Sequence, residues 1–593
     1  KFKKGYFPYK FNLFKNMNYI GPIPDREMFN PELMGVSKQH IDKVKCSQKD
    51  KCDHCNFNRW YDEQEGEYDM AKELREYCRS DVDILAEGMH AYRMQGVQKN
   101  RVDPLRTITS ASYSMKVYNT KFCPSVEELD KENGFEPDQR FSKALEGEGD
   151  ERELGGCCIL SRDEYNQIKP AFTGGRTEVF QLEKSYTDEE IKEGKSIEYI
   201  DIVSLYSTVQ YYDALPYGIP TIKNFDANQQ VNAMESALTC FGFVECDMIC
   251  PQDLHIPVIG AKKDGKFIFD LRPIKKTLVC TPELNVALKH GYVIKHVYKT
   301  ISFRSSKSMF KKYVANFLKT KTEANGFNGS PEEEAEFRKS YKELYGDELG
   351  ELRSNPGAKA MSKICLNSLW GKFGQSPNHK TNVFVSTLGE WFKIIARCNN
   401  NEITINSIKD LGDSLHVTFT ELDESKTSLA KTNVALCAMI TSNARCRLYE
   451  VLGKLGKRAL YADTDSVIFS QEPGEWQPEK SKLMGCWEDE LDGEKIQALA
   501  AIAPKTYAFK TTTKKNDVKA KGMTLNQANY SKINMKAFQD MAKGKIKSLR
   551  GCQLNFKKSK DGISTSIGVK DLSMDRDKFK RIINADNSTS PYK

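Results

Sequence analysis

The stretch Tyr461-Ala-Asp-Thr-Asp-Ser-Val-Ile-Phe469 constrains the fold more than any other part of the chain. Apolar residues flank a short polar tip, which is the pattern of two antiparallel strands joined by a tight turn. Side chains alternate along an extended chain, so Asp463 and Asp465 are expected on one face. Two carboxylates that close repel each other unless a cation lies between them, and Mg²⁺ prefers such hard oxygen ligands. The stretch predicts a metal-binding hairpin; the alternative is a metal-free polar turn.

A further carboxylate, Asp201, interrupts the apolar run 197–203, which predicts a buried strand. A carboxylate in such a strand is costly to bury unless it is paired or binds a metal. The alternative is a helix N-cap, a position that Asp favours. Together with Asp463 and Asp465 it makes three carboxylates, a set suited to holding two divalent ions for phosphoryl transfer.

A helix is predicted from Asn355, a good N-cap, and Pro356, a good first helical residue. It ends at Gly371 or continues through Phe373. Steps of four, four and three residues place four side chains on one face: Lys359, Lys363, Asn367 and Trp370. Two cations, an amide and an indole on one face suit a nucleoside triphosphate, although an ordinary amphipathic helix is the alternative.

The charge distribution points to a polyanionic partner. The net charge is +8, but residues 505–560 hold 15 Lys and Arg against two acids, and residues 301–322 hold six against none. Such basic zones favour nucleic acid, with solvated lysine-rich faces as the alternative. Further helices are expected at 73–92, 308–373 and 434–455, and a hairpin around Gly412.

The compartment follows from what the sequence lacks. No apolar run is long enough to cross a bilayer and the N-terminus carries no signal-peptide core, so an intracellular protein without a membrane partner is expected. Seventeen scattered cysteines fit a reducing compartment. Because the chain begins with Lys1 rather than Met, it is expected to be a fragment or a processed product.

Six motifs resemble those of family B DNA polymerases, in the same order along the chain. Three resemble the polymerase motifs: Asp201-x-x-Ser-Leu-Tyr206, Lys363-x-x-x-Asn-Ser-x-Trp-Gly371 and Tyr461-x-Asp-Thr-Asp-Ser466. The others resemble the Tyr-x-Gly-Gly linker, a DNA-contacting motif of the protein-primed branch and the Lys-x-Tyr motif: Phe172-Thr-Gly-Gly175, Thr441-Ser-Asn-Ala-Arg445 and Lys505-Thr-Tyr507. The chain is most similar to the protein-primed polymerases of Maverick/Polinton elements, a placement supported by Lys4–Pro8 and Asn367–Gly374.

The resemblance implies roles for individual residues. Asp201, Asp465 and the main-chain carbonyl of Ile202 are implied as ligands of two Mg²⁺ ions, with Mn²⁺ as an alternative, and Asp463 as an auxiliary acid. Tyr206 is implied as the steric gate that rejects a ribose 2′-hydroxyl. The other implied nucleotide-binding residues are Arg353, Lys359, Lys363, Asn367 and Trp370. The implied DNA-binding residues are Gly174, Gly175, Thr441, Arg445, Lys505 and Tyr507.

The resemblance also implies a mixed α/β, multi-domain fold: a right hand of palm, fingers and thumb behind a truncated RNase H-like 3′–5′ exonuclease domain. The expected domains are the exonuclease remnant (1–120), a connector (121–175), the palm (176–304 and 376–510), the fingers (305–375) and the thumb (511–593). Two insertions of the protein-primed type are expected within the palm, at about 216–300 and 382–423. In that family the first docks the priming protein, and the second wraps the template and aids strand displacement.

The N-terminal part departs most from the family pattern. Tyr77-Cys-Arg-Ser-Asp81 resembles the third exonuclease motif, with Tyr77 and Asp81 on one helix face. The two motifs that should precede it are not found, so the proofreading site is expected to be incomplete in this chain. Nearby, Cys46, Cys52 and Cys55 match no closed zinc template, and free thiols in a loop are favoured over a zinc site.

The resemblance implies a DNA-directed DNA polymerase that adds dNTPs to the 3′ end of a primer on a DNA template. It further implies a terminal priming protein and replication of a linear mobile element or virus-like genome, in the nucleus if the host is a eukaryote. Two alternatives remain open. One is a catalytically silent nucleic-acid-binding relic, and the other is a two-metal nuclease, which would leave Tyr206 and the cationic helix face unexplained.

Overall fold

The computed structural model describes residues 5–29, 53–140, 160–263, 265–377, 380–422, 429, 432–513, 516–525, 527–559, 562–576 and 579–593. The chain forms two compact units, Lys1–Ile108 and Thr109–Lys593. The first boundary therefore lies at residue 108 rather than at the expected 120. Cys46 and Cys52 lie outside the described residues, so the preference for free thiols over a zinc site remains a prediction from sequence.

The N-terminal unit is built around α3 (Met70–Asn100), with α2 (Asp53–Asp62) and the paired strands β1 (Ile20–Gly21) and β2 (Tyr68–Asp69). The Asp69 side chain accepts a hydrogen bond from the Lys72 amide and caps α3, so the helix begins before the expected residue 73. It ends where Arg101 adopts a left-handed conformation. The buried aromatic rings of Phe7, Phe29 and Phe57 supply the core of this unit.

The segments predicted as the palm form a nine-stranded sheet, called the palm below, which collects segments far apart in the sequence. Its strand order is β20-β19-β18-β5-β16-β15-β3, with β17 paired to β5 and β4 to β18. Its strands are β3 (Thr177–Val179), β4 (Glu183–Ser185), β5 (Ser196–Ile202), β15 (Ala459–Asp463), β16 (Ser466–Gln471), β17 (Trp487–Asp489), β18 (Ile496–Ala503), β19 (Thr506–Thr511) and β20 (Asn516–Ala520). The predicted strand at 197–203 and the predicted hairpin are confirmed.

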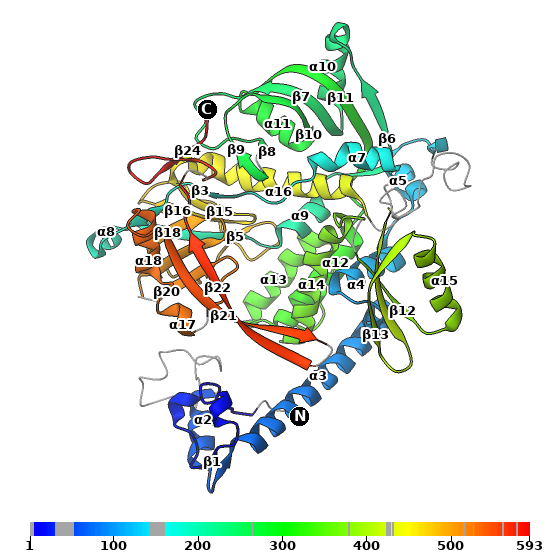
Figure 1. The fold of residues 1–593 in the computed structure, drawn as a ribbon. Helices are drawn as coiled ribbons and strands as arrows, with labels where there is room; N and C mark the ends of the chain where they lie inside the picture. The colour runs from blue at the N-terminus through cyan, green and yellow to red at the C-terminus, as the bar shows by residue number, and fades with distance from the viewer. Residues whose placement is uncertain are drawn as a thin grey trace. The chain divides into compact units, whose positions relative to one another are not determined.

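Two helices connect the palm to its surroundings. α16 (Val434–Leu455) has the predicted bounds and is buried along most of its length. It lies between the palm and the sheet of the first insertion (Figure 1). α9 (Leu205–Tyr212) follows β5 directly, because Ser204 takes a left-handed backbone conformation that turns the chain.

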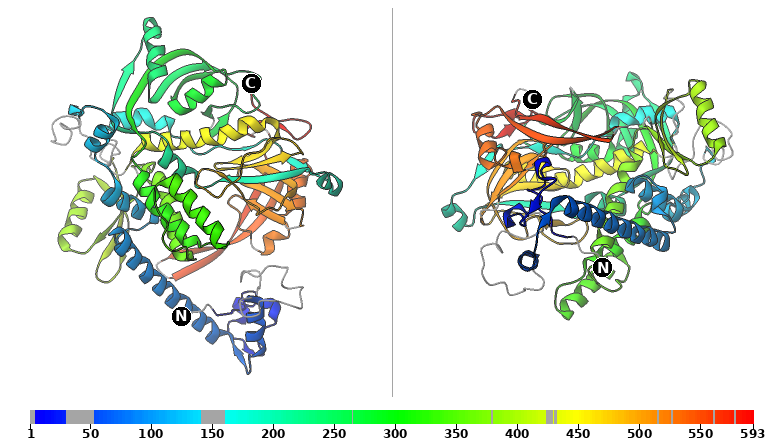
Figure 2. Two further views of the ribbon diagram at one scale, coloured as in Figure 1. Left: turned by 180° about the vertical axis from the view of Figure 1, so that it is seen from behind. Right: turned by 60° about the horizontal axis from the view of Figure 1, so that its bottom comes forward.

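The helical zone predicted as the fingers holds three helices: α12 (Lys311–Asn325), α13 (Pro331–Tyr345) and α14 (Pro356–Phe373). Gly326 and Gly346, both at positive φ, end the first two helices. The Asn355 side chain caps α14 through the Ala358 amide at 3.1 Å, as the sequence predicted. The helices lie side by side in both orientations (Figures 1 and 2).

The segments expected as the connector and the first insertion form helices and a separate sheet. The connector holds α4 (Ser110–Val117), α5 (Val126–Asn133) and α7 (Arg162–Ile168), and α8 (Asp188–Lys192) precedes β5. The insertion is a four-stranded sheet of order β10-β7-β11-β6, carrying two helices and a small hairpin. These elements are β6 (Leu215–Asn224), α10 (Gln230–Thr239), β7 (Gly242–Ile249), β8 (Gly260–Lys263), β9 (Lys266–Phe269), β10 (Ile274–Cys280), α11 (Thr281–Lys289) and β11 (Val293–Ser306).

The second insertion is a three-stranded sheet of order β12-β14-β13 with one helix and its own small core. Its elements are β12 (Thr381–Val385), α15 (Leu388–Asn399), β13 (Ile403–Asp410) and β14 (Leu415–Glu421). The hairpin predicted around Gly412 is confirmed, and Gly412 supplies the positive φ of the turn.

The C-terminal region differs from the single thumb expected at 511–593. β20 extends the palm sheet, while α17 (Gln527–Tyr530), α18 (Met535–Ala542) and the hairpin of β21 (Ser548–Ser559) and β22 (Gly562–Ser573) form the thumb-like part (Figure 2). The last strands, β23 (Ile582–Ile583) and β24 (Thr589–Ser590), return to the palm beside β3. Among the described helices of both units, none is long and apolar enough to span a bilayer.

Candidate active site

Two carboxylates meet at one end of the palm sheet. Asp201, near the end of β5, lies opposite Ser466 of β16, and the Ile202 amide donates to the carbonyl of Asp465 at 2.8 Å. Asp465 lies in the hairpin turn, where Thr464 adopts a positive φ. The turn, rather than strand alternation, therefore brings Asp465 to Asp201.

The protein leaves this pair short of positive charge. Burial and then the neighbouring Asp465 raise the pKa of Asp201 to about 8. Burial also raises the pKa of Asp465 to about 6, with Asp463 adding to the shift. A buried carboxylate pair favours a divalent cation, and its oxygens are the donors that Mg²⁺ takes. Within the described residues, no three His, Cys, Asp or Glu side chains converge into a ready-made metal cluster.

Asp463 is held by the protein itself. Lys505 Nζ lies 3.0 Å from its Oδ1, and the hydroxyls of Thr177 and Thr464 donate to the same oxygen, each at 3.1 Å. Of the three carboxylates predicted from sequence, Asp201 and Asp465 thus form a pair, whereas Asp463 is ion-paired with Lys505. This arrangement suits the auxiliary role expected for Asp463.

Sequence reasoning missed two acids on β17 and in the turn after it. Glu488 lies directly opposite Asp201 in the sheet, and the Glu490 amide donates to the carbonyl of Tyr199. Both acids contribute to the raised pKa of Asp201. The acidic run Trp487-Glu-Asp-Glu490 was the available signal, but only sheet pairing places it beside β5.

Two aromatic rings from different elements stack beside the carboxylate pair. Tyr206 of α9 and Trp370 of α14 lie with ring centroids 3.9 Å apart at an interplanar angle of 22°. Burial and then Asp465 raise the pKa of Tyr206 to about 12. The stack joins the palm to the fingers helix and forms an aromatic wall, the position predicted for the sugar and base of a nucleotide.

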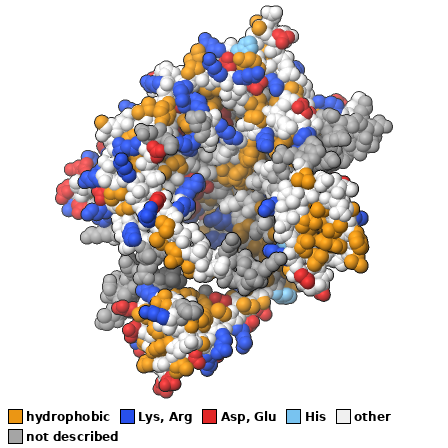
Figure 3. All heavy atoms as spheres, viewed as in Figure 1, with side chains coloured by type: hydrophobic (Ala, Val, Ile, Leu, Met, Phe, Trp, Pro, Cys, Tyr) orange, Lys and Arg blue, Asp and Glu red, His pale blue; other side chains and the backbone are white. Residues whose placement is uncertain are grey.

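A cationic cluster lies on the fingers. Lys359, Lys363 and Asn367 of α14 are exposed, as their shared helix face predicts, and Arg353 is exposed before the helix. Lys321 of α12, which sequence reasoning missed, donates to Ser204 Oγ at 3.1 Å. Burial and the nearby Lys363 and Lys359 lower its pKa. Figure 3 shows Lys and Arg side chains in the hollow between the palm and the fingers.

Lys505 and Tyr507 have unequal access to a primer. Lys505 is exposed and its backbone amide donates to Tyr461 Oη at 2.7 Å. Tyr507 is buried, with its hydroxyl 3.0 Å from that of Tyr199, and burial raises its pKa. Lys505 can therefore reach a nucleic acid directly, whereas Tyr507 anchors β19 within the palm.

The expected DNA contacts of Thr441 and Arg445 require correction. Thr441 is fully buried and its hydroxyl donates to the carbonyl of Cys437 within α16. Arg445 is only 4% exposed and is ion-paired with Glu283. It also donates to the carbonyls of Thr173 and Gly174, at 3.2 and 2.9 Å. Arg445 therefore holds the linker motif in place, whereas Thr441 is hydrogen-bonded within α16.

The linker glycines differ in what they contact. Gly174 is exposed, as a DNA-contacting residue requires. A Cβ on Gly175 would lie 2.7 Å from the Thr464 side chain in the turn between β15 and β16. Gly175 is therefore needed for close packing of the linker against that turn. Ser207, the residue after Tyr206, donates to the carbonyl of Leu366 in α14 at 3.3 Å.

The exonuclease-like residues lie in the N-terminal unit. Tyr77 and Asp81 occupy one face of α3, as their spacing predicts, and Tyr77 stacks on Phe7 with ring centroids 4.8 Å apart. The Tyr77 hydroxyl also contacts that of Tyr9. Asp81 is exposed.

Comparisons with known proteins agree with this arrangement. The sequence profile of the family described as "DNA polymerase type B, organellar and viral" matches residues 1–454. A probable DNA polymerase of Ascobolus immersus is 24% identical over 511 residues, which cover 85% of this chain and 34% of that relative. The DNA polymerase of Bacillus phage Nf is 22% identical over 486 residues, which cover 79% of this chain and 65% of the relative.

The fold is similar to that of a solved polymerase. Phi29 DNA polymerase complexed with primer-template DNA and incoming nucleotides aligns with a TM-score of 0.52 at 17% identity, over 87% of this chain and 75% of that one. This chain spans 34% to 40% of the length of three fungal relatives, from Ascobolus immersus, Neurospora intermedia and Podospora anserina.

Proposed function

This chain belongs to the organellar and viral DNA polymerases of type B, and from that membership we propose that it is a DNA-directed DNA polymerase. The reaction is template-dependent addition of dNTPs to a 3′ end. One observation supports the proposal most: three functional groups from distant segments meet at one end of the palm. These are the carboxylate pair of Asp201 and Asp465, the Tyr206–Trp370 stack and the lysines around Lys363.

The site residues divide the work of phosphoryl transfer. Asp201, Asp465 and the Ile202 carbonyl would hold divalent ions, Mg²⁺ or Mn²⁺, which when bound stabilise charge on the transferring phosphoryl group. Lys321, Lys359 and Lys363 attract and orient the triphosphate. Asn367, one turn after Lys363 on α14, and Arg353, exposed before that helix, would extend this binding surface.

Tyr206 and Trp370 select the nucleotide. The stacked Tyr206 ring offers a flat, rigid surface under the sugar, which excludes a 2′-hydroxyl. The Trp370 indole presents a large surface to the nascent base pair. Lys505, exposed beside Asp463, would contact a primer phosphate, and the long hairpin of β21 and β22 would contact the duplex backbone.

The finer assignment is protein-primed replication of a linear mobile element or virus-like genome of the Maverick/Polinton kind. The two segments expected as insertions support it, because each forms a small sheet separate from the palm sheet. The first would dock a terminal priming protein and the second would wrap the template. In a eukaryotic host the reaction would take place in the nucleus. Tyr77 and Asp81 would belong to a 3′–5′ exonuclease site that needs further residues.

Primer extension with Mg²⁺ tests the proposal. A labelled primer annealed to a template should lengthen with the wild-type chain and dNTPs. Shortening of the primer would indicate a nuclease, and binding without either change would indicate a silent relic. Adding a candidate priming protein in place of the primer tests the finer assignment, because only a protein-primed enzyme links the first nucleotide to protein.

A further inference from the structure

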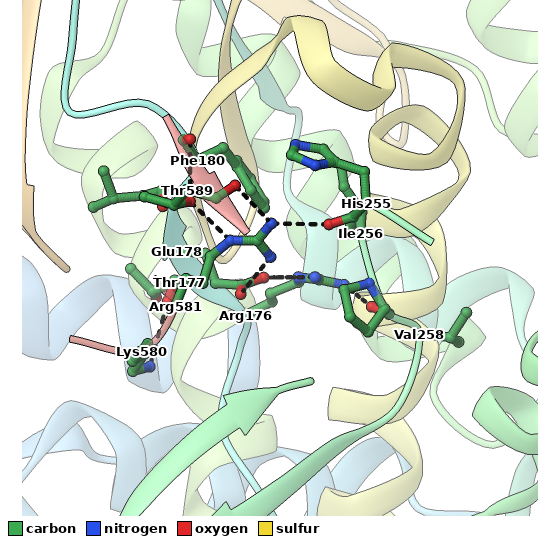
Figure 4. A network of polar contacts seen from close by, with 12 residues as sticks. Arg176, Thr177, Glu178, Phe180, His255, Ile256, Val258, Lys580, Arg581 and Thr589 are labelled. Atoms are coloured by element: carbon green, nitrogen blue, oxygen red, sulfur yellow. Dashed lines mark hydrogen bonds and ion pairs between the residues drawn. The ribbon is translucent and has the colours of Figure 1, made fainter. Parts of the chain in front are cut away.

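A buried polar network ties the end of the chain to the palm (Figure 4). Arg176, Glu178 and Arg581 are each 1% exposed. Arg176 Nε donates to Glu178 Oε2 at 2.6 Å, and Arg581 Nη1 lies 3.5 Å from Oε1 of the same carboxylate. Two guanidinium groups thus share one acid in the interior.

Main-chain carbonyls and aromatic rings satisfy the remaining charge. Arg176 Nη1 donates to the carbonyl of Pro257 at 2.7 Å, and Arg581 Nη2 to that of His255 at 2.8 Å. Their guanidinium groups lie over Phe269 and Phe180, with 4.0 and 5.0 Å to the ring centroids. Buried charges keep such partners at fixed positions, because leaving any of them unpaired is costly.

Through β3 the same network reaches the turn between β15 and β16, which holds Thr464 and Asp465 and is called the catalytic turn here. The carbonyl of Arg176 accepts a hydrogen bond from the Thr464 amide at 2.7 Å. Thr177, the next residue, donates its hydroxyl to Asp463 at 3.1 Å. The turn that carries Asp465 is therefore hydrogen-bonded to residues 176 and 177. The side chains of Arg176 and Glu178 are in turn fixed by the buried network.

The C-terminal segment completes the network. Thr589 Oγ1 accepts from Arg581 Nε at 2.8 Å and lies 2.9 Å from the carbonyl of Val179 in β3. The Thr589 amide donates to the carbonyl of Phe180 at 2.8 Å. Residues 579–593 are thus bound to the strand that supports the turn.

We propose that residues 579–593 form a strap that sets the position of the catalytic turn, with Arg581 and Arg176 as positioning residues acting through β3. For catalysis this rests on the proposed function; for the turn's conformation it rests on the contacts alone. Neither arginine touches the carboxylate pair in this arrangement. Their loss should therefore loosen the turn and slow the chemical step while leaving primer-template and nucleotide binding unchanged.

The test compares Arg581→Met, Arg581→Lys and Thr589→Val with Arg304→Met. The control breaks a partly buried ion pair elsewhere, Arg304 with Asp130 at 2.7 Å, whose side chains are 25% and 4% exposed and which joins β11 to α5. Amide hydrogen exchange of residues 459–471 should speed up in Arg581→Met and, to a smaller extent, in Thr589→Val, but not in the control. Single-nucleotide addition at saturating dNTP should slow about tenfold in Arg581→Met, with KM and primer-template Kd unchanged.

Partial recovery of both readouts is expected in Arg581→Lys, which keeps the charge but not the full set of donors. If Arg581→Met and Arg304→Met lower Tm equally and exchange in 459–471 is the same in both, the strap is merely structural and the proposal fails. If Arg581→Met does not fold, the milder Thr589→Val decides by the same exchange measurement. A wild-type chain without nucleotide addition would overturn the proposed function, while hydrogen exchange would still decide the strap.

Discussion

Two carboxylates of the same palm strand are treated in opposite ways. Glu198 is 3% exposed and binds Lys495 and Lys480 at 2.6 and 2.9 Å. Burial alone would raise the pKa of Glu198, but these partners and Ser196 hold it below its usual value. Asp201, three residues later, faces further acids instead, and its pKa rises to about 8. The acid that stabilises the fold is thus paired with lysines of the protein. The acid that we propose as a metal ligand has no such ion pair among its described neighbours and is surrounded by further acids.

The largest expected effect is on catalysis. Asp201→Asn should slow nucleotide addition about a thousandfold or more, equivalent to about 4 kcal/mol of lost transition-state stabilisation, because a metal ligand disappears. Tm should not fall, because the raised pKa leaves the metal-free Asp201 carboxyl largely protonated near neutral pH, and Asn is similar to that neutral form in size. Single-turnover extension measures the nucleotide addition rate, and thermal melting measures Tm. An extension rate close to wild type would remove Asp201 from the site.

The next effect is the pH dependence of metal binding. Both carboxyls of the pair bind protons more tightly than usual, and Mg²⁺ requires the charged forms. Affinity for Mg²⁺ should therefore fall as the pH drops from about 8 to about 6, by about a hundredfold overall if one proton is displaced. Calorimetry in buffers of different ionisation enthalpy measures the proton released. Asp201→Asn is the control and should release fewer protons when Mg²⁺ binds. A Mg²⁺ affinity that does not depend on pH would contradict the raised pKa values of the pair.

The converse prediction concerns Glu198. Glu198→Gln should destabilise the fold by about 2 kcal/mol, because it removes the acid that binds Lys495 and leaves Lys480 with Asp489 alone. The lysine side chains are 27% and 37% exposed, so water limits the loss. Denaturant unfolding measures it, and the rate per folded molecule should stay near that of wild type. A large loss of rate with unchanged stability would erase the distinction between the two acids.

The smallest effect tests the acid opposite Asp201. Glu488→Gln should change the nucleotide addition rate about fivefold, because it removes a neighbouring charge rather than a predicted ligand. Asp489→Asn is the matched control: it is the next residue on the same strand, and its side chain binds Lys480. Equal effects of the two substitutions would show that strand stability, not charge at the site, is responsible.

Local pattern was enough for elements whose signals are contiguous. The hairpin at Tyr461–Phe469, the strand before Ile202 and the helix over 434–455 were all predictable, because periodicity and turn chemistry act within a few residues. The spacing of Lys359, Lys363 and Trp370 likewise determined that they share a face of α14. The ends of the first two helices in the zone at 308–373 were not predicted, since Gly326 and Gly346 were not interpreted as helix ends.

Tertiary structure alone decided which distant groups meet. Glu488 joins Asp201 through strand pairing, and Lys321 joins Lys363 because α12 packs beside α14; nothing in either local sequence specifies its neighbour. A motif resemblance placed Thr441 and Arg445 at DNA, but packing of α16 turned them inward. The sequence by itself determined which residues carry charge and which local elements hold them. The fold decided which charges are neutralised from within, as at Glu198, Arg445 and Arg581, and which remain for a ligand, because burial and pairing depend on segments hundreds of residues apart.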